Sequence, residues 1–142
     1  MIYGLDTTFI IQVDVVDHER HAESVRLRDN LLAQGHSYAL APQVLAEYVH
    51  IVTDPNRFLN PAPMKTALEH SRMWWNSAEI RQIIPSDDAV QLFHTWMKEH
   101  GLGRKRILDT LLAATYATAG LTAIISSNAR DYSRFFETVV LS

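Results

Sequence analysis

Short apolar runs alternate along the chain with longer segments in which apolar residues recur at helical spacing. Five of the runs are typical of buried β-strands because each is brief and ends at polar or turn-forming residues. The predicted strands are 2–5, 37–40, 80–84, 121–125 and 138–141. Strands that alternate with helices predict an α/β fold, in which helices cover a central, mainly parallel sheet.

The segments between these runs predict the helices. We expect helices over 7–13, 21–33, 42–52, 64–77, 86–100 and 107–119, and a short turn or helix over 128–136. Pro42 suits a first helical turn, and Ser86, followed by two aspartates, is typical of an N-terminal cap. Gly35 follows the second predicted helix as a C-terminal cap. The run Asp54-Pro55-Asn56-Arg57 predicts a turn, and the stretch 58–63, with two prolines, predicts a loop.

Size and composition predict a single domain over residues 1–142. A chain of 142 residues buries roughly two thirds of its unfolded surface, and 47% hydrophobic with 20% charged residues is ordinary for a globular protein. The absence of cysteine excludes disulfides, zinc–thiolate sites and thiol nucleophiles. No apolar run approaches the ~20 residues of a membrane helix, and the first segment does not have the basic start of a signal peptide. We therefore expect a cytoplasmic protein with no membrane association.

The net charge of −3 argues against general electrostatic binding to nucleic acid. A polyanionic substrate would need a local basic patch or a bound metal ion to offset repulsion. The run Arg104-Lys105-Arg106 is a candidate patch for RNA phosphates, although three charges in a row are also common in a solvated loop.

Acidic and polar side chains stand where predicted strands and helices begin or end. Asp6 directly follows the first strand, and the polar run 126–131 follows the fourth. Ligands of open parallel sheets bind beyond the carboxyl ends of the strands, so these groups share a crevice if the two strands are neighbours. With Glu47 and Asp109, the chain offers three carboxylates to a hard cation such as Mg²⁺ or Mn²⁺.

Each of these residues also has an ordinary structural explanation. Asp6 could cap the helix that follows it, and Glu47 could be a solvated surface group. Asp109 lies near the start of its helix, where the dipole stabilises an acid, and Asn128 and Asp131 are common turn residues. Local sequence alone leaves both interpretations open. A zinc site is disfavoured because no two histidines are spaced four residues apart as a helical pair requires.

Four segments carry a resemblance to a known family. They occur in the order Met1-Ile2-Tyr3-Gly4-Leu5-Asp6-Thr7-Thr8, Leu45-Ala46-Glu47, Leu108-Asp109-Thr110-Leu111-Leu112 and Ser126-Ser127-Asn128-Ala129-Arg130-Asp131-Tyr132. The turn His18-Glu19-Arg20-His21-Ala22 also looks like the corresponding turn of many members. The sequence resembles the PIN-domain family over nearly its whole length, and within it the VapC-type toxins of type II toxin–antitoxin pairs.

The resemblance implies a three-layer α/β/α fold and a Mg²⁺- or Mn²⁺-dependent endoribonuclease that hydrolyses RNA phosphodiester bonds with metal-activated water. It implies that Asp6 and Asp109 are the principal metal ligands and that Glu47 completes the pocket directly or through water. Asn128 would join them in catalysis.

The last motif departs from the family pattern at two positions. Ser126 stands where Thr is usual, and Tyr132 stands where Phe is usual. Asn128 is neutral where many relatives carry Asp, so the fourth pocket residue could be Asn128 or Asp131. We expect Ser126 and Asp131 to be supporting residues.

The resemblance also implies a homodimer and a cognate VapB-like antitoxin. The apolar and aromatic stretch 58–75 is a candidate surface for either partner, or part of the protein's own core. Trp74, Trp75 and Trp96 are expected in the core or an interface. Two further function classes stay open: a non-catalytic PIN-like module that binds RNA or protein, and a PIN nuclease acting on DNA or in RNA processing.

Overall fold

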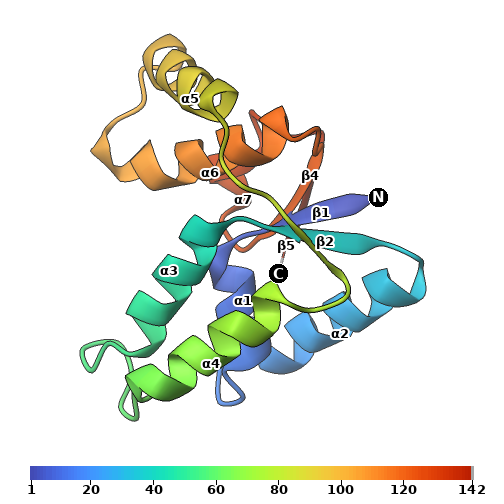
Figure 1. Ribbon diagram of the computed structural model, residues 1–142, viewed down its shortest axis with the longest axis vertical. Helices are drawn as coiled ribbons and strands as arrows, with labels where there is room; N and C mark the ends of the chain where they lie inside the picture. The colour runs from blue at the N-terminus through green and yellow to red at the C-terminus, as the bar shows by residue number, and fades with distance from the viewer. Residues whose placement is uncertain (142) are drawn as a thin grey trace.

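The computed structural model describes residues 1–141 and contains a five-stranded parallel sheet with helices on both faces (Figure 1). The strands are β1 (Ile2–Leu5), β2 (Ser37–Leu40), β3 (Ile80–Gln82), β4 (Ala123–Ser126) and β5 (Thr138–Leu141). Their order in the sheet is β3-β2-β1-β4-β5, and every neighbouring pair is parallel. The predicted α/β class is therefore confirmed.

The helices form two layers around this sheet. They are α1 (Thr7–Asp14), α2 (His21–Ala33), α3 (Pro42–Val52), α4 (Met64–Trp75), α5 (Asp87–Glu99), α6 (Ile107–Thr118) and α7 (Ala129–Tyr132), with a 3₁₀ turn, η1 (Arg104–Arg106), before α6. Figure 1 shows α1, α2 and α4 on one side of the sheet and α5 and α6 on the other. Right-handed crossovers require this arrangement, because the chain moves across the sheet in opposite directions before and after β3.

The strand order reverses at β1, and this reversal positions the candidate site. The strands β2 and β3 lie to one side of β1, and β4 and β5 lie to the other. Leu5 pairs with Ile125, and the backbone N–H of Asp6 donates to the carbonyl of Ile125 at 3.2 Å. The prediction that Asp6 and the polar run after β4 face one crevice at the carboxyl ends of neighbouring strands is confirmed.

Several elements differ from the sequence prediction, among them the last helix, which covers Ala129–Tyr132 rather than 128–136. The helix α4 ends at Trp75 because Asn76 caps it, with both its backbone and side-chain N–H groups donating to the carbonyl of Arg72. The strand β3 ends at Gln82, short of the predicted 84. Leu121 donates to the carbonyl of Tyr116 and so closes the turn after α6 rather than starting β4. The 3₁₀ turn η1 was not predicted.

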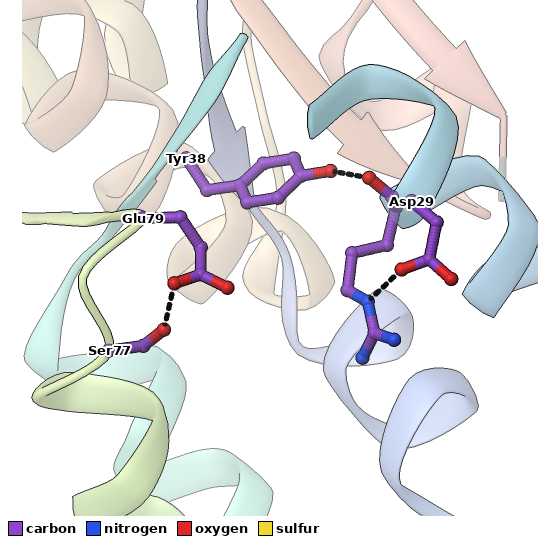
Figure 2. A network of polar contacts seen from close by, with 5 residues as sticks. Asp29, Tyr38, Ser77 and Glu79 are labelled. Atoms are coloured by element: carbon purple, nitrogen blue, oxygen red, sulfur yellow. Dashed lines mark hydrogen bonds and ion pairs between the residues drawn. The ribbon is translucent and has the colours of Figure 1, made fainter. Parts of the chain in front are cut away.

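Buried tyrosines connect the layers through their hydroxyl groups. The Tyr38 hydroxyl points from β2 toward α2 and donates to the carbonyl of Arg28 at 2.6 Å, close to the Ser77–Glu79 hydrogen bond (Figure 2). Tyr116 lies at the other end of β2. Its hydroxyl donates to the carbonyl of Leu5 at 2.6 Å and accepts from the backbone N–H of Ala41 at 3.3 Å. Tyr116 therefore holds together the carboxyl ends of β1 and β2, directly beneath the crevice.

The tight fit of Tyr116 predicts the effect of a mutation in β1. A Cβ added at Gly4 would lie 2.6 Å from Cδ2 and 2.8 Å from Cε2 of Tyr116. The ring cannot swing away without breaking both bonds of its hydroxyl, so we expect Gly4→Ala to lower the free energy of unfolding by about 1–3 kcal/mol. Urea denaturation would measure the loss. In Gly103→Ala the new Cβ meets nothing within 4 Å, so this control should be neutral or slightly stabilising.

The three tryptophans pack against the core, which is one of the two positions that the sequence predicted. Trp74, Trp75 and Trp96 are partly buried and pack against the core, and Trp96 stacks on Phe135 with ring centroids 4.3 Å apart. None of the helices in residues 1–141 combines the length and apolar character that a membrane span needs.

Candidate active site

Asp6 begins α1 as its N-terminal cap and is almost completely buried. Its Oδ1 accepts from the backbone N–H of Thr7 at 2.7 Å, and its Oδ2 accepts from the hydroxyls of Ser126 at 2.6 Å and Thr8 at 3.4 Å. Burial raises the pKa of Asp6 to about 6, the charges of Asp109 and Glu47 add to the rise, and the bonds from Ser126 and Thr7 oppose it. The capping role considered from the sequence is confirmed, and the carboxylate also belongs to an acidic cluster.

Ser126 and Asn128 build the wall of the site on the β4 side. The Ser126 hydroxyl donates to Asp6 and accepts from the backbone N–H of Asn128 at 2.9 Å. The Asn128 side chain is exposed and makes no capping bond to α7. In this geometry Asn128 contacts Ser126 through its backbone, and the expected roles of both residues in catalysis stay predictions.

Asp109 lies in the first turn of α6 and is held by Tyr132. The Tyr132 hydroxyl donates to Oδ1 of Asp109 at 3.1 Å, and the tyrosine is fully buried. Burial raises the pKa of Asp109, while the Tyr132 bond and the charge of Arg106 oppose the rise. The sequence alone shows only that Tyr132 stands where Phe is usual in the resembled family. Its hydroxyl, at a position where the resembled family usually has Phe, was the available signal for this contact.

Asp131 and Arg106 form an ion pair between α7 and the start of α6. Asp131 is thus engaged in a contact between two helices, and its expected supporting role stays a prediction. Arg106, a candidate for RNA contact, is engaged in this pair, whereas Arg104 and Lys105 are exposed and form no ion pair within residues 1–141. These two remain available to a phosphate.

Glu47 reaches the cluster from α3 and is half-buried. Burial raises the pKa of Glu47 and the charge of Asp109 adds to the rise, while the hydroxyl of Thr7 and the charges of Arg57 and His50 oppose it. Thr7 Oγ1 is itself buried, and in the described part of the chain it lies near Glu47 without completing a hydrogen bond. A buried polar atom without a partner beside Glu47 is suited to bind water or another ligand in the pocket.

Glu47 and Asp109 line a shared cleft of about 300 Å³ between α3 and α6. Its walls are formed by Gln43, Val44, Ala46, Glu47, Leu108, Asp109, Leu111 and Leu112. Two acids that come from different helices therefore face one opening, and the charge of Asp109 is felt by both Asp6 and Glu47. All three candidate carboxylates thus belong to one electrostatic cluster.

The donor set fits a hydrated hard cation rather than a closed metal cage. Across residues 1–141, no three His, Asp or Glu side chains lie close enough together to hold a metal ion by themselves. Mg²⁺ commonly takes one or two carboxylates and keeps several waters, so Asp6 and Asp109, with Glu47 further out, are chemically suitable. Each principal carboxylate is already oriented by a hydroxyl, from Ser126 and from Tyr132, as outer-shell partners of metal ligands usually are.

Solved structures resemble this chain over almost its entire length. VapC20 of Mycobacterium tuberculosis, described as a sarcin-ricin loop cleaving toxin, has a TM-score of 0.72 at 16% identity, with 96% of each chain covered. The chain has the PIN-like fold of VapC. FitAcB of Neisseria gonorrhoeae matches this VapC-like fold with a TM-score of 0.64 at 19% identity, covering 99% of this chain and 96% of that one.

A third VapC-like match is VapBC-1 of nontypeable Haemophilus influenzae, with a TM-score of 0.64 at 16% identity, covering 100% of this chain and 97% of that one. No protein-family model and no curated protein matches the sequence. The likeness therefore lies in the three-dimensional arrangement, and identities this low establish the fold alone.

Proposed function

We propose that this protein is a metal-dependent endoribonuclease and the toxin of a VapBC-type toxin–antitoxin pair. The observation that supports this most is the acidic cluster of Asp6, Glu47 and Asp109 at the point where the strand order reverses, in a chain with a VapC-like fold. VapC20 is described as cleaving the sarcin-ricin loop, and other neighbours as toxin–antitoxin complexes. We carry these activities to this chain as part of the proposal.

In this proposal the chain's own residues position the reacting groups. Asp6 and Asp109 bind Mg²⁺ or Mn²⁺, which supplies Lewis-acid activation of water and charge stabilisation at phosphorus. Ser126 fixes the orientation of Asp6, and Tyr132 fixes that of Asp109. Glu47 completes the pocket directly or through water. The pocket residue after β4 that contributes a group is Asn128, through its backbone, since Asp131 is engaged with Arg106.

Positive charge near the cluster would attract the RNA backbone. Arg104 and Lys105 are exposed on η1, immediately before the helix that carries Asp109. We propose that they bind phosphates beside the metal, with the salt dependence that such contacts confer. Arg106 would contribute mainly by lowering the pKa of Asp109.

The stretch 58–75 supplies a candidate partner surface for a VapB-like antitoxin or a second copy of the chain. Leu59, Met64, Leu68 and Met73 are 97%, 55%, 54% and 70% exposed. The alternative that this stretch is buried in the protein's own core is therefore wrong for these four side chains, although Ala67 is fully buried. Large exposed apolar side chains grouped on one segment are typical of an interface.

Cleavage of a nucleic-acid panel tests the proposed function. Structured tRNA, fragments of rRNA and single-stranded DNA would each be incubated with the protein in Mg²⁺, Mn²⁺ or EDTA. We expect RNA to be cut only when a metal ion is present, because the carboxylates repel one another without it and no metal-activated water is then available. Cleavage that persists in EDTA would contradict the proposal. Cleavage of DNA alone would favour a different nuclease, and binding without cleavage would favour a non-catalytic module.

A further inference from the structure

A second cleft, of about 410 Å³, lies beside Asp6. It is lined by Thr8, Ile11, Gln12, His18, Ile51, Arg57, Phe58 and Ser127, and we call it the flanking cleft. Two of its lining residues connect it to the acidic cluster. The Thr8 hydroxyl donates to Asp6, and the backbone N–H of Ser127 donates to Thr8 Oγ1 at 3.4 Å. A ligand that fills the flanking cleft would therefore lie next to whatever binds at Asp6.

The charges of the flanking cleft suit a polyanion. None of its eight lining residues is acidic, and the exposed side chain of Arg57 is near enough to Glu47 to lower the pKa of that carboxyl. A cavity of about 280 Å³ between α1, α2 and α4 differs in this respect, because Asp14 and Glu79 line it and its arginine, Arg28, is paired with Asp29. Figure 2 shows Glu79 near Tyr38 in that region. A phosphate would be repelled there and attracted in the flanking cleft.

An ion pair orients Arg57 but leaves most of its N–H donors free. Its Nε lies 3.6 Å from Oδ2 of Asp54, and the Arg57 side chain is 60% exposed. Asp54 Oδ1 accepts from the backbone N–H of Asn56 at 2.8 Å, so the carboxylate is fixed by the turn. A guanidinium carries five N–H donors, and its Nη groups remain available for a phosphate.

His18 and Phe58 provide contacts of two other kinds. His18 Nδ1 accepts from the backbone N–H of Arg20 at 3.0 Å. In the neutral ring the proton is therefore on Nε2, which makes that atom a hydrogen-bond donor. Phe58 is half-buried and packs against the core, so its ring is held in place. Fixed aromatic rings stack on the bases of single-stranded nucleic acid.

We propose that the flanking cleft binds the RNA nucleotide next to the phosphate that is cleaved, with Arg57 on its own phosphate, Phe58 against its base and His18 as a hydrogen-bond donor. This inference rests on the proposed endoribonuclease function. Two turns that lie outside the acidic cluster would then contact the RNA, namely the turn that begins at His18 and the Asp54–Arg57 turn. The base must be unstacked to reach Phe58, so the substrate is RNA in a loop or single strand rather than a continuous duplex.

Binding without catalysis tests the cleft. The probe is a fluorescein-labelled oligouridylate, and the dissociation constant is measured by fluorescence anisotropy in EDTA, where cleavage does not occur under the proposed function. We expect Arg57→Ala to raise the dissociation constant about fivefold to tenfold and to lower the slope of log K against log salt by about one. Phe58→Leu, which keeps an apolar side chain against the core, should weaken binding about fivefold without changing the salt slope.

The matched control is Arg72→Ala, which removes an exposed arginine of α4 that lines a different hollow with Glu69. Its dissociation constant should stay close to that of wild type. An equal rise of the dissociation constant in Arg57→Ala and Arg72→Ala would overturn the proposed RNA binding in the flanking cleft, because the effect would then be one of net charge. So would the absence of RNA binding by the folded wild type, or unchanged binding in both flanking-cleft variants.

The outcomes separate this inference from the proposed function. If Arg57→Ala and Phe58→Leu weaken RNA binding but no RNA is cleaved with Mg²⁺ or Mn²⁺, the flanking cleft stands and the endoribonuclease proposal fails. If wild type cleaves RNA and both variants keep its dissociation constant and its KM for the cleaved RNA, the function stands and the cleft fails. Thermal unfolding of each variant shows that the fold is intact.

Discussion

Replacing Asp6 with Asn is expected to abolish metal-dependent RNA cleavage and yet to leave the metal-free protein at least as stable as wild type. The exchange removes the charge that we propose binds the cation. Even changes in the partners of metal ligands commonly cost about 10–100-fold in affinity or activity, so we expect loss of a principal ligand to cost on the order of 100-fold or more. The cleavage rate in Mg²⁺ or Mn²⁺ is the measurement.

The stability half of this prediction follows from the burial of Asp6. Its pKa rises from an ordinary value of 3.8 to about 6, so the ionised group destabilises the folded state near neutral pH. By linkage this amounts to about 3 kcal/mol, part of which Asn regains because it can still accept from the backbone N–H of Thr7. The weaker bond from Ser126 offsets some of that gain. Urea denaturation in EDTA would measure the difference.

A matched acid-to-amide exchange separates loss of charge from loss of a ligand. Asp29 lies on α2, is exposed, and is paired with Arg28 at 3.0 Å. Asp29→Asn should keep both cleavage and stability near wild type, because exposed ion pairs contribute little. Full activity in Asp6→Asn would refute the assignment of Asp6 as a principal ligand. An unfolded Asp6→Asn would refute the argument from burial.

The sequence predicted those features of the fold that depend on local pattern. The strands at Ile2–Leu5, Ser37–Leu40 and Thr138–Leu141 have the predicted bounds, because each is a short apolar run bordered by polar or turn residues. The meeting of Asp6 and Ser126 was also predictable, although 120 residues separate them. It required only that two parallel strands be neighbours, since their carboxyl ends then share one edge.

Contacts that depend on how helices pack could not be predicted in this way. Tyr132 reaches Asp109 across 23 residues and Tyr116 reaches Leu5 across 111, and nothing in the local sequence names the partner of either hydroxyl. Arg106 was grouped with Arg104 and Lys105 by adjacency alone, whereas its ion pair with Asp131 depends on where α7 docks. Periodicity assigns residues to helix faces but does not give the crossing of α6 and α7.

The position of Glu47 likewise depends on helix packing and could not be predicted from the sequence. The sequence left open whether this residue was a solvated surface group or part of the pocket. The structure gives an intermediate answer, because Glu47 is half-buried and lines a cleft with Asp109. That answer depends on the approach of α3 to α6, two helices that are distant in sequence. The roles of the three acids in metal binding remain predictions that Asp6→Asn and its control would test.

The stability of the protein is expected to depend on pH in opposite directions without and with a metal ion. Asp6 loses its proton near 3.8 in the unfolded chain and near 6 in the folded protein, so between these values the folded state binds more protons. Stability in EDTA should therefore fall as the pH rises through this window and then level off. From about pH 5 to about pH 7 the loss due to Asp6 is roughly 1 kcal/mol. Burial raises the pKa of Glu47 and of Asp109 too, which acts in the same direction.

A cation that binds ionised carboxylates reverses this trend. Protons and Mg²⁺ compete for the same oxygens, so the stabilisation by Mg²⁺ should grow as the pH rises through about 6. Urea denaturation at about pH 5 and about pH 7, with Mg²⁺ and with EDTA, measures how the free energy of unfolding changes with pH in each condition. In Asp6→Asn both pH dependences should flatten, because the exchange removes the group that titrates and a proposed ligand together. If wild type in EDTA instead gains stability across the window, burial of Asp6 does not govern its titration. If Mg²⁺ stabilises the protein equally at both pH values, the cation binds elsewhere.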